Sequence, residues 1–360
     1  MSDGGVVGEI DLVRAGGRPK HLVVLLTALV IAYPLVPQGG LRQICFSLLG
    51  AACVAMGLWG AGAIRTAART GWVILLAGFG TMVLGDAVFS LEQAVFHVGF
   101  YPAPSDAVYL TAYVLLVVGM LRLVTGRRGR RDPVPLLDSA IVAVGAGIVV
   151  VTFFITPQAG DSSLNLAGRA VASAYPGADV LLMATLARIW NTASARSTAC
   201  RLLLLSLGAT LVADIGWDIL ALADPQADTP AWMDVLWLVG YVCAGTAACT
   251  HSAASLSGRA PEVEAPPTGV SPLVATACLL PGLTLLVDGL SGEPVSWLVI
   301  STGSVALAVL VLLRLRLLLR AVAAQAAQLS AAGITPAVVG ADADQPWEIE
   351  LRQRSGMSRD

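Results

Sequence analysis

Two apolar stretches of the chain carry aspartates and aromatic residues at the same spacing. The first stretch contains, in order, Gly85, Asp86, Pro102, Asp106, Tyr109, Leu110 and Tyr113. The second contains Ala213, Asp214, Pro230, Asp234, Trp237, Leu238 and Tyr241. Each position of the second stretch lies 128 residues after its counterpart in the first. An aspartate in an apolar helix costs about 2.5–3.5 kcal/mol at the bilayer centre, so its usual explanation is a functional one.

Carboxylates with aromatic side chains around them can bind a cation, an amine or protons in surroundings of low dielectric constant. Residues three and seven positions apart share one face of a helix, so the acids and aromatics following each proline would line the same side. We therefore predict an outward-facing acidic-aromatic pocket. Its candidate ligand-binding residues are Asp86, Phe89, Asp106, Tyr109, Tyr113, Asp214, Trp217, Asp218, Asp234, Trp237 and Tyr241.

Purely structural explanations for the same acids remain open. Asp106 and Asp234 fall near expected helix N-termini, where a carboxylate can accept hydrogen bonds from free backbone N–H groups. Asp86 and Asp214 could instead accept hydrogen bonds from neighbouring helices. A further acid, Asp179, follows a proline that should kink its helix.

The composition places these acids in a membrane. Charged residues make up 13% of the chain, against roughly 25% in soluble domains, and mean hydropathy is +0.77. A helix needs about 20 apolar residues to cross a bilayer. We predict an all-α polytopic membrane protein with ten spans, near 21–37, 42–64, 71–97, 105–124, 135–156, 166–190, 199–223, 231–251, 271–289 and 295–318. The first is short enough to be partly interfacial.

The basic residues predict how these spans are oriented. With the N-terminus in the cytoplasm, most arginines fall in the inner loops, and only Arg42 and Arg169 fall on the outer side. This bias follows the positive-inside rule, so both termini are expected in the cytoplasm of a cell bounded by the plasma membrane. Spans three and four and spans seven and eight then cross in matching directions. They form a partial parallel repeat, as in transporters whose halves are related by an axis along the membrane normal.

Outside the spans the chain divides into short segments. We expect a cytoplasmic N-terminal segment at 1–20, a transmembrane domain at 21–320, a cytoplasmic helix projecting from the membrane at 321–334, and a disordered tail at 335–360. The projecting helix is either a simple cap or a contact for a cytoplasmic signalling partner. A homodimer in the lipid bilayer is left open, and the net charge of −2 indicates no nucleic-acid partner.

The sequence lacks the residues that several kinds of catalytic or cofactor-binding site require. Lys20 is the only lysine and lies outside the spans, which excludes an intramembrane Schiff base and a Walker-type phosphate loop. The chain has no HExxH and no GxSxG sequence, and its six cysteines form no CxxC pair. We therefore expect no enzymatic activity, no metal and no cofactor.

The succession Gly85-Asp86, Tyr101-Pro102-Ala103-Pro104-Ser105-Asp106-Ala107-Val108-Tyr109-Leu110, Leu137-Asp138 and Tyr175-Pro176-x-x-Asp179 resembles a known type of protein. It is similar to the multi-pass N-terminal sensor region of actinobacterial signalling proteins with GGDEF and EAL domains, the diguanylate cyclases and cyclic-di-GMP phosphodiesterases. The resemblance covers roughly residues 20–330 and implies sensing without specifying a stimulus. Neither a Gly-Gly-Asp-Glu-Phe nor a Glu-Ala-Leu motif is present, so it implies no cyclase activity here.

The residues and the resemblance together favour a non-catalytic membrane sensor or regulatory module that signals through its C-terminal helix. A small proton-coupled secondary transporter using the same carboxylates is the alternative. A structural membrane subunit, whose acids only hold helices together, is the third.

Overall fold

The structure is a computed structural model that describes residues 18–65, 68–96, 101–125, 134–190, 197–223, 229–257, 272–291 and 295–331. Residues 1–17 of the predicted N-terminal segment lie outside the described residues. The predicted tail at 335–360 lies outside them as well.

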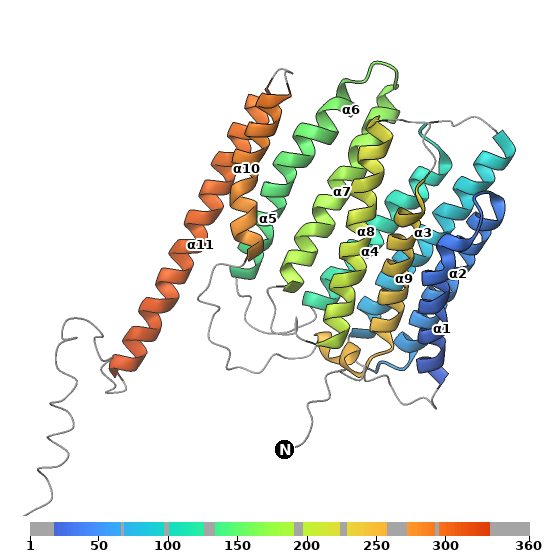
Figure 1. Ribbon diagram of the computed structural model, residues 1–360. Helices are drawn as coiled ribbons and strands as arrows, with labels where there is room; N and C mark the ends of the chain where they lie inside the picture. The colour runs from blue at the N-terminus through green and yellow to red at the C-terminus, as the bar shows by residue number, and fades with distance from the viewer. Residues whose placement is uncertain are drawn as a thin grey trace, which may run out of the picture. The chain divides into compact units, whose positions relative to one another are not determined.

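Helices account for nearly all of the described chain (Figure 1). They are α1 (Arg18–Ala32), α2 (Gly40–Gly62), α3 (Ala68–Phe96), α4 (Pro104–Thr125), α5 (Val134–Val150), α6 (Thr156–Gly160), α7 (Leu166–Trp190), α8 (Thr198–Ala223), α9 (Ala231–Ala248), α10 (Pro272–Leu290) and α11 (Trp297–Ala331). Short helical turns lie at η1 (Tyr33–Leu35), η2 (Val151–Ile155) and η4 (His251–Ser257). Every predicted span except the fifth corresponds to one of these helices, with ends that differ by a few residues, apart from the C-terminal extension of α11.

Nine helical segments of the described chain are long and apolar enough to cross a membrane, which indicates a multi-pass membrane protein. The remaining predicted span, the first, corresponds to α1, which has 15 residues and so extends about 22 Å at 1.5 Å per residue. The α-helix ends at Ala32, two residues before Pro34, because proline supplies no N–H for a helical hydrogen bond. The turn η1 adds three residues to this shorter segment.

The fifth predicted span is built from three consecutive pieces. After α5 the backbone widens into the π-helical turn η2 and then continues as α6, where a proline stands in the first turn. A π-turn leaves a local departure from the regular helical hydrogen bonds, and such turns are frequent at functional positions. In contrast, α7 contains Pro176 and is a single helix from Leu166 to Trp190.

The helices pack around two hydrophobic clusters. The larger one joins α1 to α4 with α7, α8, α9 and η4, and Trp72, Phe79 and Leu116 are among its fully buried side chains. In this part α3 packs along α4 and α8 along α9, α2 contacts both α3 and α9, and α7 contacts both α4 and α8. The smaller cluster joins α5, α10 and α11 through Ile141, Ala277 and Leu307. Figure 1 shows α5 and α10 lying side by side.

Small residues allow some helices of the bundle to pack closely. A Cβ atom added at Gly119 of α4 would lie 2.5 Å from the backbone nitrogen of Leu75 on α3. Glycine at this position therefore lets the two backbones approach, which is the usual device for packing helices in membranes. The close packing fixes the positions of α3 and α4, and with them the acidic and aromatic side chains that they carry.

The chain divides into two compact units, Met1–Arg314 and Leu315–Asp360, and the boundary between them falls within α11. Within the first unit, α11 is tied to α5 by the buried side chains of Leu307 and Arg314. Leu307 joins the smaller hydrophobic cluster, and the Arg314 guanidinium is paired with the Asp138 carboxylate. The predicted boundary at residue 321 falls inside α11, which is one helix as far as Ala331.

Candidate functional site

Asp86, in the middle of α3, accepts two hydrogen bonds from tyrosines on different helices. The hydroxyl of Tyr109 on α4 donates to its Oδ1 atom over 2.7 Å. The hydroxyl of Tyr241 on α9 donates to its Oδ2 atom over 3.3 Å. Both carboxylate oxygens of this intramembrane acid therefore have a donor.

Asp214 on α8 accepts hydrogen bonds in a matching way. The indole Nε1 of Trp237 on α9 donates to its Oδ1 atom over 2.7 Å. The hydroxyl of Tyr113 on α4 donates to its Oδ2 atom over 3.0 Å. The carboxylate again has one donor on each oxygen, from two different helices.

These four bonds cross between the two helix pairs α3–α4 and α8–α9. Each aspartate has one donor 23 residues later in the chain, on the helix paired with its own. Its other donor comes from the opposite pair, so that Asp86 is bound by Tyr241 and Asp214 is bound by Tyr113. We call Asp86, Tyr109, Tyr113, Asp214, Trp237 and Tyr241 the crossed network. It connects side chains that are more than 100 residues apart in the sequence.

The glycine before Asp86 has a direct part in this geometry. A Cβ atom added at Gly85 would lie 2.6 Å from the ring of Tyr109. The tyrosine ring therefore lies against the bare backbone of α3, which lets its hydroxyl reach the carboxylate of the next residue.

Aromatic rings enclose the α9 side of the crossed network. Phe46 of α2 and Phe79 of α3 pack edge-on against Tyr241, with ring centroids 6.2 and 5.7 Å away. Phe46 also packs edge-on against Trp237 at 6.5 Å. These contacts bury the Tyr241 ring and hold its hydroxyl in position beside Asp86.

Asp106, at the start of α4, combines two roles. Its Oδ2 atom accepts a hydrogen bond from the backbone N–H of Ala103 over 2.7 Å, which satisfies a free donor at the N-terminus of its own helix. Its Oδ1 atom accepts one from the hydroxyl of Tyr175 on α7, also over 2.7 Å. Glu92 of α3 completes this helix start, because its carboxylate accepts from both the backbone N–H and the hydroxyl of Ser105.

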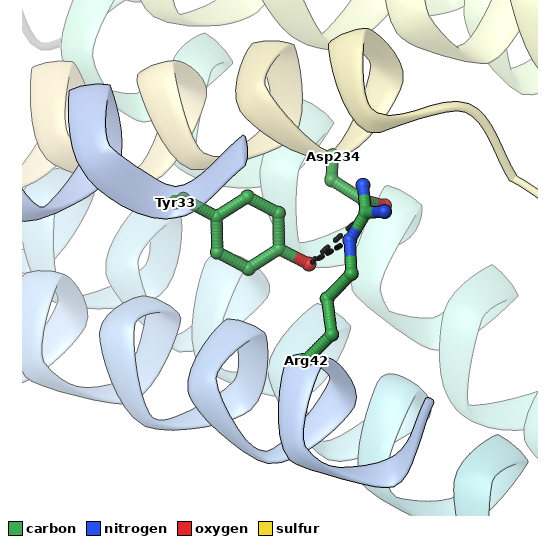
Figure 2. A network of polar contacts seen from close by, with 3 residues as sticks. All are labelled: Tyr33, Arg42 and Asp234. Atoms are coloured by element: carbon green, nitrogen blue, oxygen red, sulfur yellow. Dashed lines mark hydrogen bonds and ion pairs between the residues drawn. The ribbon is translucent and has the colours of Figure 1, made fainter. Parts of the chain in front are cut away.

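Asp234, the counterpart of Asp106, forms different contacts. It makes an ion pair with Arg42 of α2 over 2.8 Å and accepts a hydrogen bond from the hydroxyl of Tyr33 over 3.0 Å. Figure 2 shows the three side chains converging, with the Arg42 guanidinium beside the Tyr33 hydroxyl. No side-chain hydrogen bond caps α9, so the capping explanation applies to Asp106 and not to Asp234.

Arg42 is, with Arg169, one of the two arginines that the predicted topology places on the outer side. Only 8% of the residue is exposed, and its guanidinium carbon lies 5.3 Å from the centre of the Tyr33 ring. Its charge is compensated by the carboxylate of Asp234. Arg42 therefore forms an ion pair inside the bundle.

Five of the predicted site residues lie outside the crossed network. Asp106 and Asp234 make the separate contacts described above, and the other three are Phe89, Trp217 and Asp218. The side chains of Phe89 and Trp217, which are also 128 residues apart, are 42% and 38% exposed at the surface of the bundle. Asp218, one turn after Asp214, is half-buried and lies within electrostatic range of it. The structure brings together the other six predicted residues, which are those of the crossed network.

Four residues outside the predicted set belong to this region, namely Tyr33, Arg42, Tyr175 and Asp179. The sequence held a signal for two of them, because Tyr33 and Tyr175 are both followed by proline, and each donates to the acid at the start of a helix. Asp179 is 2% exposed, and its Oδ1 atom has no hydrogen-bond partner. The hydroxyl of Tyr113 and the carboxylate of Asp214 are within hydrogen-bonding reach of Asp179.

What the region can do chemically follows from its groups. It offers carboxylates, phenols and an indole, which can hold protons, amines or cations. Among the described residues, no group of three or more His, Cys, Asp or Glu side chains is arranged to hold a metal ion. The chain matches no protein-family model, no curated protein and no solved structure.

Proposed function

We propose that this protein is a non-catalytic membrane regulatory module in which the crossed network couples two halves of the bundle. The observation that supports this most directly is the exchange of donors between the helix pairs α3–α4 and α8–α9. Because each carboxylate is bound from both pairs, any change at one carboxylate alters a bond within a pair and a bond between pairs. A stimulus acting there would favour one arrangement of the pairs over another.

The crossed network also supports a duplicated origin for the two pairs. Positions 128 residues apart supply the same kind of group to the same kind of bond: Asp86 matches Asp214, and Tyr113 matches Tyr241. Tyr33 and Tyr175 extend the correspondence, because each donates to the acid at the start of α9 or α4. A parallel repeat places two equivalent sites around one axis, as in other duplicated membrane proteins.

The output in this proposal is α11. Its continuous helix extends to Ala331, beyond the ion pair at Arg314, and we propose that the part after 321 contacts a cytoplasmic signalling protein. The sequence resemblance to sensor regions of GGDEF and EAL proteins supports this arrangement. Here the catalytic domain would be supplied by a separate chain.

The test combines the network with the output. A photocrosslinking amino acid at Gln325, an exposed position of α11, is used in cells with the wild-type chain and with Asp86→Asn and Asp214→Asn variants. We expect a cytoplasmic protein to be captured by the wild type and its yield to change several-fold in both variants. Phe89→Leu, at an exposed position of α3, is the matched control and should leave the yield unchanged.

Two other results would contradict the proposal. If the two aspartate substitutions leave the yield of the captured partner unchanged but abolish substrate flux in proteoliposomes, the protein is a proton-coupled transporter. The observation that favours this second function is that the buried Oδ1 atom of Asp179, a residue next to Asp214, has no hydrogen-bond partner. If the variants only lower stability, the acids hold the helices together and the protein is a structural subunit.

A further inference from the structure

Asp179 on α7 differs from the other acids of the region in its hydrogen bonds. Asp86, Asp106, Asp214 and Asp234 each accept hydrogen bonds from two donor groups. Asp179 is buried to 2% exposure, and its Oδ1 atom has no partner at all. A buried carboxylate oxygen without a donor has lost its hydration and gained no bond in exchange, so it requires an explanation.

The groups facing Asp179 are mostly acidic. From α8 they are the carboxylates of Asp214 and Asp218, and from α4 the hydroxyl of Tyr113. The other ionisable residue on a helix packed against α7 from the α5 side is Asp138, which is held by Arg314. The segments η2 and α6 carry no ionisable residue. Among the described residues, no basic side chain forms an ion pair with Asp179 or Asp214.

Two ionised carboxylates cannot remain in contact in such surroundings. Carboxylate oxygens are acceptors only, so a hydrogen bond between Asp179 and Asp214 requires a proton on one of them. An uncompensated charge buried among apolar helices is strongly unfavourable, and two like charges repel in addition. Asp214 already accepts from Trp237 and Tyr113, which stabilises its ionised form.

We propose that Asp179 and Asp214 form a buried carboxyl pair that binds one proton. The proton is covalently bound to Asp179, whose carboxyl O–H donates a hydrogen bond to the Asp214 carboxylate. Binding converts Asp179 from an acceptor into a donor and leaves a single negative charge on the pair, stabilised by Trp237 and Tyr113. Release sends the proton to solvent and leaves two adjacent carboxylates, which must then separate. Because Asp214 belongs to the crossed network, that separation acts on both helix pairs.

This inference rests on the proposed function and deepens it by naming a proton, bound at Asp179 beside the crossed network, as the stimulus. It also specifies which acid exchanges it. The ion pair at Asp234 and the helix start at Asp106 are then fixed parts of the structure, whereas the α7–α8 contact is the part that changes with proton binding.

The test is infrared spectroscopy of the full chain in lipid vesicles, titrated with pH. A protonated carboxyl group gives a C=O stretching band that shifts in D₂O. The wild type should show such a band at neutral pH, and Asp179→Asn should lack it, since the asparagine amide can donate to Asp214 in place of the acid and preserve the fold. Asp214→Asn should lose its band at a lower pH than the wild type, because the neighbouring like charge is gone.

Asp161→Asn is the matched control. Hydrogen bonds from the hydroxyl and backbone N–H of Ser163 lower the pKa of the exposed Asp161, so this residue is ionised at neutral pH and contributes no band. The variant should therefore have the wild-type spectrum. Absence of a titrating carboxyl band in the wild type overturns the proposal without any variant, and so does its full retention in Asp179→Asn.

The same variants separate this inference from the proposed function. If the band is lost in Asp179→Asn while capture of a partner at Gln325 is unaffected by network substitutions, the proton site stands and the regulatory role fails. If capture depends on Asp86 and Asp214 but the wild type shows no protonated carboxyl group, the regulatory role stands and another stimulus acts on the network.

Discussion

At the scale of single residues, the central requirement is a donor for every buried carboxylate oxygen. Asp86 and Asp214 meet it with phenol and indole groups, which stabilise an acid without bringing a second full charge into the bundle. Asp234 meets it in part with Arg42. Neutral donors hold a carboxylate less tightly than a guanidinium does, since they lack the Coulombic attraction between opposite full charges. The neutral donors are therefore the contacts that can exchange.

A single methyl group at residue 85 should disturb one of these contacts. In Gly85→Ala the new Cβ atom would lie 2.6 Å from the Tyr109 ring and push its hydroxyl away from Asp86. We expect the free energy of unfolding to fall by about 1–3 kcal/mol, the usual cost of overpacking. Unfolding in mixed detergent micelles measures it.

Gly80→Ala on the same helix is the control for that substitution. Its Cβ atom would lie 3.5 Å from Val54, an ordinary contact. Alanine is favoured over glycine inside a helix by roughly 0.5–1 kcal/mol, so this variant should be unchanged or slightly more stable. Equal losses in the two variants would show that the close approach of Tyr109 does not matter.

At the scale of elements, the attachment of α11 to the bundle depends on few contacts. Leu307 joins the small hydrophobic cluster with α5 and α10, and Arg314 pairs with Asp138. A buried ion pair contributes little net stability over well-packed apolar residues, but a single partner left alone is costly. The pair therefore serves mainly to fix the register of α11 against α5.

A double-mutant cycle tests this attachment. Asp138→Leu and Arg314→Leu alone should each lower the free energy of unfolding by about 3–5 kcal/mol, because each removes one partner of a buried ion pair. The double variant should be close to the wild type. Arg316→Leu, at an exposed position two residues later, should have little effect. Additive losses in the double variant would show that the two side chains are not coupled.

At the scale of the whole molecule, function depends on which side of the membrane each end faces. The arginine distribution predicts cytoplasmic termini and places the segment after α6 outside and η4 inside. Single cysteines at Asp161 and Ser255, both exposed positions, report the two sides. Of the six native cysteines only Cys278 is exposed, so the background variant needs Cys278→Ala.

A membrane-impermeant maleimide should label the cysteine at position 161 in intact cells. It should label the one at position 255 only after the membrane is permeabilised. The reverse result would place the termini, and with them α11, outside the cell, and would remove the cytoplasmic output from the proposed function.

The sequence by itself determined the spans and the identity of the acids. Apolar runs long enough to cross a bilayer are visible without any structure, because the length of a span is set by the bilayer and not by its neighbours. The spacing shared by the stretches after Asp86 and Asp214 likewise singled out the residues that form the crossed network. It could not show that the shared residues meet across the two stretches.

Only the tertiary structure decided which side chains meet. The rotation of a helix about its own axis is fixed by its packing partners, so Phe89 and Trp217 lie at the surface although they share the spacing of the buried residues. Tyr33 and Arg42 reach Asp234 from about 200 residues earlier in the chain, a distance at which no local pattern carries information. The sequence defines the length and polarity of each helix, whereas the choice of donor for each carboxylate depends on contacts that exist only once the helices are packed together.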